Sequence, residues 1–238
     1  MDGSHRKSGK AERLRVQRAE RAGSDQHDRP AFPRLGRGLV AILRGLRPDE
    51  AVAIGRAIFE AGVEAIEVPL NSPDPFSSIA RIVEALPATA LVGAGTVLTP
   101  ADVDGLQKAG GRLLVSPNID AEVMGRAMNH GMVTMPGVFT PTEAFQAIRL
   151  GASALKFFPA SVLGAAGIAA MRAVLPSDML VGAVGGVSEK DFAGYKAAGV
   201  SVFGLGSSLF KPGMNVDEVA TRAQAAVVAW DAAFGAVR

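Results

Sequence analysis

The chain has 238 residues, of which 48% are hydrophobic and 20% charged, and this size and composition suit one sizeable α/β domain. The absence of cysteine excludes disulfides, thiol catalysis and thiolate metal sites, and by default it favours a cytoplasmic location. No apolar stretch reaches the roughly 18 residues of a membrane span, and the N-terminus lacks the apolar core of a signal peptide, so we expect no membrane partner.

A basic segment poor in apolar residues opens the chain, and we predict that residues 1–33 form a disordered extension. Residues 1–38 hold ten Lys or Arg against five Asp or Glu, whereas the remainder holds fifteen against eighteen. So few apolar side chains cannot offset the entropy cost of ordering the segment. A nucleic-acid contact is the alternative, but no aromatic residues are interleaved for base stacking, so we expect no nucleic-acid partner.

From residue 39 onward, eight continuous apolar runs alternate with amphipathic segments. The runs are Leu39–Leu43, Ala65–Leu70, Leu91–Val97, Leu113–Val115, Val133–Pro136, Ala154–Phe158, Leu180–Val184 and Val202–Leu205. Continuous hydrophobicity is typical of parallel strands buried on both faces, and the Asp, Ser, Thr, Pro and Gly residues between the runs match helix starts and ends. Eight such units favour a (β/α)8 TIM barrel over an open doubly wound sheet and predict one domain, residues 34–238.

Two ionisable residues stand among apolar neighbours near the carboxyl ends of predicted strands, where barrels of this kind carry their sites. Lys156 lies in ALKFFP, where desolvation would lower the pKa of its amine and allow attack on a carbonyl carbon. A lysine that only binds an anion fits the local pattern equally well. Glu67, in EAIEVPL, is either a general base or the permanent ion-pair partner of Lys156 or Arg44.

Glycine-rich turns follow the last two predicted strands. Gly185 and Gly186 come after the seventh run, and Gly206 with Ser207 comes after the eighth. Backbone N–H groups exposed by glycine, with a helix start behind them, form an anion cradle at this position in barrels. The two turns together therefore predict a phosphorylated ligand.

Other kinds of chemistry lack suitable residues. His5 and His27 lie in the extension, and His130 precedes a glycine at a predicted helix end. Without cysteine, a well-placed histidine or clustered aspartates, we expect no metal site and no Ser-His triad. The stretches GAGTV and GLGSS do not match the full dinucleotide fingerprint, so no cofactor is expected.

The strand-end motifs together resemble those of a known family, the class I aldolases acting on 2-keto-3-deoxy-6-phosphogluconate and its galactonate epimer. The similarity covers roughly residues 39 to 230. It rests on IEVPLNSP, VGAGTVLTP, LLVSPNI, MPGVFTPTEA, ALKFFPAS, GAVGGVSE and FGLGSSLF, in the family's order and spacing.

This resemblance implies a role for each candidate residue. Lys156 would form the Schiff base and Glu67 would be the catalytic acid/base, while Arg44 and Thr96 would contact the substrate. Arg44 could alternatively form a salt bridge at the rim. The phosphate would lie on Gly185, Gly186, Gly206 and Ser207. A homotrimer without cofactor is also implied.

Two positions favour the galactonate branch of the family. Asn71 stands where gluconate-type members usually carry Arg, and Val184 stands where they tend to have Thr. Loss of that hydroxyl is a physical route to selecting a C4 epimer. We therefore expect cleavage of 2-dehydro-3-deoxy-6-phosphogalactonate to pyruvate and glyceraldehyde 3-phosphate. A gluconate-specific or dual-specificity aldolase, and a non-covalent phosphate-binding isomerase or epimerase, remain as alternatives.

Overall fold

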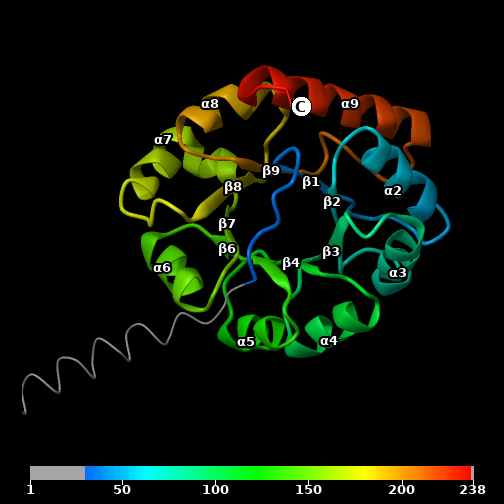
Figure 1. Ribbon diagram of the computed structural model, residues 1–238, viewed down its shortest axis with the longest axis horizontal. Coiled ribbons are helices and arrows are strands. Elements are labelled where there is room, and N and C mark those ends of the chain that lie inside the picture. Colours follow the sequence, from blue (N-terminus) through cyan, green and yellow to red (C-terminus); the bar gives the residue numbers. More distant parts are fainter. Residues whose placement is uncertain (1–29, 237–238) are drawn as a thin grey trace, which may run out of the picture.

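Parallel strands form the centre of the fold and helices surround them (Figure 1). The computed structural model describes residues 30–236. The strands are β1 (Leu39–Ile42), β2 (Ala65–Pro69), β3 (Leu91–Gly95), β4 (Leu113–Val115), β5 (Val133–Met135), β6 (Gly137–Val138), β7 (Ala154–Phe157), β8 (Leu180–Val184) and β9 (Val202–Leu205). They pair in the order β5-β4-β3-β2-β1-β9-β8-β7-β6.

The ring closes through β5 and β6, of which only β5 lies within the fifth predicted run, Val133–Pro136. β5 pairs with β4 and β6 pairs with β7, and only Pro136 separates the two segments along the chain. Proline has no N–H for a strand ladder, which explains the interruption. The predicted barrel is thus confirmed, with the correction that a further short strand, β6, follows Pro136 beyond the fifth predicted run.

Helices follow the strands as the sequence predicts. They are α2 (Ala51–Glu60), α3 (Pro75–Ala85), α4 (Pro100–Lys108), α5 (Ala121–Asn129), α6 (Pro141–Arg149), α7 (Ala160–Arg172), α8 (Phe192–Ala197), preceded by the 3-10 turn η1 (Glu189–Asp191), and α9 (Val216–Phe234). Side chains cap several starts, because Thr99, Thr140 and Asn215 each accept the N–H three residues ahead. α7 bends at Gly164, whose φ of 70° is left-handed.

Two apolar clusters result from the alternation of side chains along the strands. One lies between the strands and the helices, with Leu155 and Phe157 among its members. The other fills the inside of the barrel and includes Ala65 and Ala154. Glu67 and Lys156 are each two residues further along the same strands, so they face the barrel interior at its carboxyl end.

The segment before β1 covers the opposite end of the barrel. Phe32 and Leu35 pack against the inner cluster, and the Ser153 hydroxyl donates to the carbonyl of Pro30. Arg37 then forms two hydrogen bonds, of 2.8 and 2.7 Å, with Asp231 on α9. The predicted extension, residues 1–33, otherwise lies outside the described residues, so its disorder stays a prediction.

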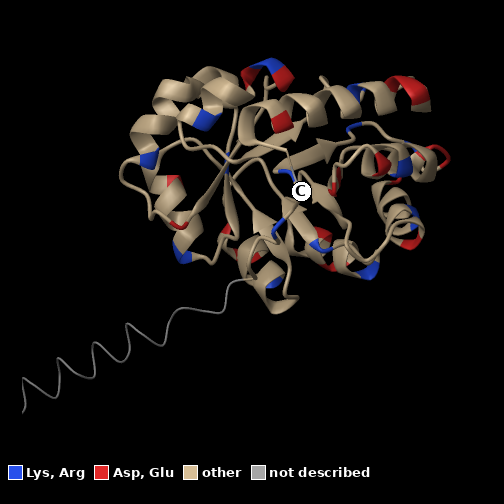
Figure 2. Cartoon of the chain, turned by 45° about the horizontal axis from the view of Figure 1, so that its top comes forward, with Lys and Arg blue, Asp and Glu red and all other residues tan. Residues whose placement is uncertain are grey.

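Charged residues of both signs lie mostly on the outer helices and their ends (Figure 2). None of the described helices combines the length and the apolar character that crossing a membrane requires.

Candidate active site

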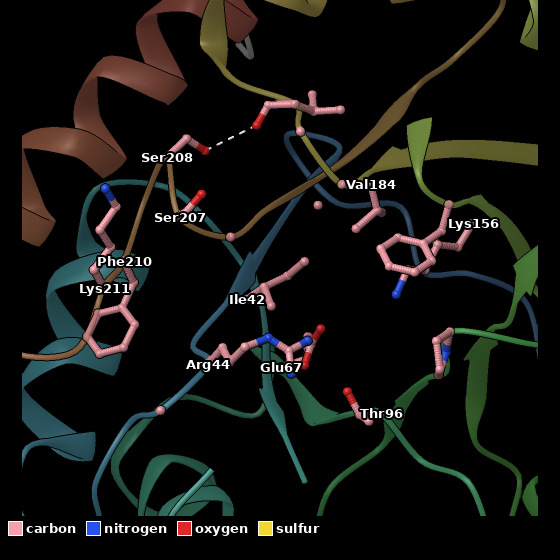
Figure 3. A pocket seen from close by; sticks show the side chains of 18 of the residues that line it. Ile42, Arg44, Glu67, Thr96, Lys156, Val184, Ser207, Ser208, Phe210 and Lys211 are labelled. Atoms are coloured by element: carbon pink, nitrogen blue, oxygen red, sulfur yellow. Dashed lines mark hydrogen bonds between the residues drawn. The ribbon is translucent and has the colours of Figure 1, made fainter. Parts of the chain in front are cut away.

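A cavity of about 780 Å³ opens at the carboxyl ends of the strands. It brings together every site residue predicted from the sequence, and Figure 3 shows Lys156, Glu67, Arg44 and Thr96 around it. The full set is Arg44, Glu67, Thr96, Lys156, Gly185, Gly186, Gly206 and Ser207. A cavity at this end of the barrel is where such folds place their chemistry.

Lys156 enters the cavity from β7 and is only 6% exposed. Its partners in the neighbouring strands, Gly137 and Gly182, carry no side chain, and the Met135 side chain occupies the space beside Gly182. The amine lies 4.7 Å from the centre of the Phe158 ring. Desolvation lowers the pKa of Lys156, although Glu67 opposes this effect and Arg44 adds to it. The environment therefore favours the neutral, nucleophilic amine.

Glu67 enters from β2 and is 2% exposed. Burial raises the pKa of its carboxyl to about 7, against the opposing charges of Lys156 and Arg44. Its Oε2 atom is buried and has no hydrogen-bond partner. Within residues 30–236, Glu67 forms no ion pair with either Lys156 or Arg44, so the permanent ion pair considered from the sequence is absent. An unpaired carboxyl that titrates near neutrality is suited to take up and return protons.

The end of β3 makes room for this carboxylate. A Cβ atom on Gly95 would lie 2.0 Å from Glu67 Oε2, so only glycine leaves the carboxyl its present position. The next residue, Thr96, has a φ of 57°, which is unusual for a β-branched side chain. Local strain of this kind persists where the surrounding structure enforces it. Thr96 is thereby held at the cavity wall.

Arg44 follows β1 and lies beside Glu67 at the mouth of the cavity (Figure 3). Its guanidinium donates a hydrogen bond to the side-chain oxygen of Asn71, which follows β2. Arg44 is therefore oriented by the amide of Asn71 and forms no salt bridge with another described residue. Its positive charge stays available for an anionic ligand.

Two loops with unused N–H groups form the other side of the cavity. Gly185 and Gly186 have φ values of 91° and 70°, and a Cβ atom on Gly186 would lie 2.4 Å from the hydroxyl oxygen of Ser161. The backbone N–H groups of Gly186, Val187, Ser207 and Ser208 donate to no acceptor within the described part of the chain. Such unpaired amides at a cavity wall are a ready anion-binding surface.

A second set of contacts fixes the loop after β9. The Ser208 hydroxyl donates to the carbonyl of Val187, which joins the two loops (Figure 3). Arg222 on α9 donates to the carbonyls of Ser207 and Ser208, each at 3.3 Å. The carbonyl of Ser207 and the N–H of Ser208 belong to one peptide group and point in opposite directions, so binding of this carbonyl to Arg222 turns the Ser208 N–H away from Arg222.

Several residues of the cavity were not predicted. Ile42 and Phe158 provide apolar walls, and Lys211 adds a further cation. A signal for Lys211 was present, since it follows Ser207 by four positions in one loop.

Some polar residues that follow the predicted strands have other tasks. Thr140 caps α6, and the Ser116 hydroxyl donates to the carbonyl of Asn118. His130 ends α5 and pairs with Asp104 at 2.9 Å. It is not among the residues that line the cavity. Among residues 30–236, no group of three or more His, Cys, Asp or Glu side chains is arranged to hold a metal ion.

Comparison with known proteins assigns the chain to a family. Residues 36–220 match the family model of the KDPG and KHG aldolases. The chain belongs to this aldolase family. The resemblance seen in the strand-end motifs is thus confirmed, and the protein is a lyase.

Individual aldolases are similar over most of their length. A protein of Rhizobium meliloti (strain 1021), named probable 2-dehydro-3-deoxy-6-phosphogalactonate aldolase, is 59% identical over 87% of this chain and 98% of its own. The 2-dehydro-3-deoxy-6-phosphogalactonate aldolase of Escherichia coli (strain K12) is 50% identical over 81% and 94%. A solved structure titled "Native KDPGal structure" superimposes with a TM-score of 0.80 at 50% identity, covering 82% of this chain and 95% of that one.

Proposed function

We propose that this aldolase cleaves 2-dehydro-3-deoxy-6-phosphogalactonate to pyruvate and glyceraldehyde 3-phosphate through a Schiff base on Lys156. The observation that carries the proposal is that one cavity contains both the buried amine of Lys156 and the buried carboxyl of Glu67, which forms no ion pair with it. Relatives at 59% and 50% identity bear the name of the galactonate enzyme, which supports the choice of substrate.

The first steps use the neutral amine. The Nζ atom of Lys156 attacks the C2 ketone to give a carbinolamine. The Glu67 carboxyl gives a proton to the hydroxyl of the carbinolamine, and loss of water leaves an iminium ion on Lys156 and a carboxylate on Glu67. Glu67 then takes the proton of the C4 hydroxyl, and the C3–C4 bond breaks. Its electron pair moves into the iminium to form an enamine on Lys156, and glyceraldehyde 3-phosphate leaves.

The remaining steps return the proton and free the lysine. Glu67 protonates C3 of the enamine, and water hydrolyses the resulting iminium to release pyruvate. A carboxyl with a pKa of about 7 serves both directions of this transfer near neutral pH. The same proton thus passes from the C4 hydroxyl to the methyl group of pyruvate.

Remote groups would position the bond that breaks. Arg44 and Thr96 would hold the carboxylate end of the substrate, while the amides after β8 and β9, with Gly186 and Ser207, would hold its phosphate. Binding energy from these two ends orients the C3–C4 bond between the amine and the carboxyl.

The galactonate preference rests on the walls of the cavity. Val184 and Asn71 both line it, so neither a threonine hydroxyl nor an arginine stands at these positions. Measuring kcat/KM on the two C4 epimers tests this choice. Equal rates would indicate a dual-specificity aldolase, and a higher rate on the gluconate epimer would contradict the proposed substrate.

A homotrimer acting in the cytoplasm completes the proposal. Large apolar side chains, Phe139, Phe145 and Val162, are exposed after β6 and on the following two helices, which suits contact with other copies. A similar solved chain belongs to a cage designed by fusing symmetric oligomeric domains. A phosphorylated acid does not cross a bilayer, so the enzyme must act in the compartment where its substrate is made. Analytical ultracentrifugation measures the oligomeric state.

Reductive trapping tests the covalent step. Incubation with pyruvate and borohydride should attach a reduced pyruvyl group to Lys156, located by peptide mass spectrometry. The Lys156→Met variant should gain no adduct, whereas Lys108→Met, which changes an exposed lysine in the last turn of α4, should react like the unchanged protein. A non-covalent isomerase or epimerase would give no adduct at all.

A further inference from the structure

The unused backbone amides on the phosphate side of the cavity carry only partial positive charges. A phosphate monoester carries a charge of roughly −1.5 to −2 at neutral pH. The ionisable side chains lining the cavity are Arg44, Glu67, Lys156 and Lys211. Lys156 acts as the nucleophile in the proposed reaction, and Arg44 is tied to Asn71 beside Glu67. Only Lys211 belongs to the loop that carries the unused amides.

Lys211 is exposed and unpaired. Its side chain forms no hydrogen bond and no ion pair with any residue between 30 and 236. The ammonium group is therefore paired with no carboxylate in the described part of the chain.

The position of Lys211 matches the expected path of the substrate. Figure 3 shows Lys211, Ser207 and Ser208 along one side of the cavity, with Lys156 on the other. A ligand joined to Lys156 at one end would extend across the cavity toward this side. Ser208 and Ser207 are themselves held in place from behind by Arg222.

We propose that Lys211 is a phosphate-binding residue, whose ammonium group contacts the phosphate bound at the amides of Ser207 and Ser208. This inference rests on the proposed aldolase function and adds one residue, Lys211, to those that would bind the substrate phosphate. A lysine acts here as a mobile point charge at the rim, so its contribution declines with ionic strength. It secures the remote end of the substrate and takes no part in bond breaking.

The test compares Lys211→Met with Lys211→Arg, using Lys108→Met as the control. Loss of a charge-assisted hydrogen bond should raise KM for the phosphorylated substrate roughly 10- to 100-fold, with kcat changed by less than about threefold. The inhibition constant of inorganic phosphate should rise in parallel, and Lys211→Arg should restore most of both. Lys108→Met should match the unchanged protein.

Pyruvate trapping separates this inference from the function on which it rests. Pyruvate has no phosphate, so Lys211→Met should form the borohydride adduct at the normal rate. A normal adduct together with unchanged KM and unchanged phosphate inhibition would overturn the role of Lys211 alone. A slower adduct in Lys211→Met would also overturn it, because the residue would then act on the reacting end. Absence of the adduct in the unchanged protein would refute the aldolase function itself.

Discussion

Replacing Gly95 with alanine should damage catalysis through Glu67 alone. The new Cβ atom would lie 2.0 Å from Glu67 Oε2 and 2.4 Å from Oε1, whereas ordinary contact begins at 3.4 Å. The carboxyl must therefore retreat by about 1.4 Å, the difference between 3.4 and 2.0 Å. Gly95 lacks a positive φ, so alanine itself fits the backbone.

The magnitude follows from this displacement. A misplacement of about 1 Å can lower catalysis on the order of 100-fold, so kcat of Gly95→Ala should fall by at least that factor. Overpacking should also lower the free energy of unfolding by about 1–3 kcal/mol. Steady-state cleavage, with pyruvate measured by a coupled assay, gives kcat. Urea unfolding gives the free energy of unfolding.

A double-mutant cycle isolates the contact. In the Glu67→Ala background the methyl group has room, so Gly95→Ala should cost little further stability. Gly125→Ala in α5 is the matched control, because nothing lies within 4 Å of its added Cβ and the helix should gain roughly 0.5–1 kcal/mol. Wild-type kcat in Gly95→Ala, or an equal stability loss in both backgrounds, would refute the steric reasoning.

Two further predictions concern ionisation and strain. The folded pKa of Glu67, about 7, exceeds its ordinary value of 4.5, so the native protein binds the extra proton and loses stability as pH rises between these values. The stability of the unchanged protein relative to Glu67→Gln should therefore fall by on the order of 3 kcal/mol from pH 4 to pH 8 in urea titrations; a flat difference would contradict the raised pKa. Thr96→Gly removes the strain of the left-handed φ of 57°, so the melting temperature should not drop. The same change deletes the hydroxyl, so kcat/KM should fall roughly 10-fold. Thr96→Ser, which keeps the hydroxyl, should retain most activity, and a lower melting temperature of Thr96→Gly would show that its conformation is unstrained.

Strand periodicity made much of the fold and site predictable. Continuous apolar runs indicated buried parallel strands, and the position of Lys156 and Glu67 near strand ends indicated a shared cavity at one end of a barrel. The alternation of side chains then fixes which residues face inward, as Ala65 and Ala154 show by packing inside the barrel two positions earlier.

Other features depend on neighbours that are distant in sequence. Gly95 matters because strand pairing brings it beside Glu67, and no local pattern reveals that contact. The absence of an ion pair between Glu67 and Lys156 likewise depends on side-chain placement inside the ring. Lys211 lies in a loop without periodicity, so the reasoning that found strand-end residues passed over it.

Phe32 and Leu35 pack beneath the inner cluster and, in the described part of the chain, cover the end of the barrel opposite the cavity. If the substrate binds as proposed, the reactant and both products would pass through the open end of the cavity, and the buried Lys156 would be reached last. Glyceraldehyde 3-phosphate would then have to depart before the tethered three-carbon fragment can be freed by water. In the reverse direction, pyruvate would have to bind first. The covered end of the barrel would therefore make substrate binding and product release ordered.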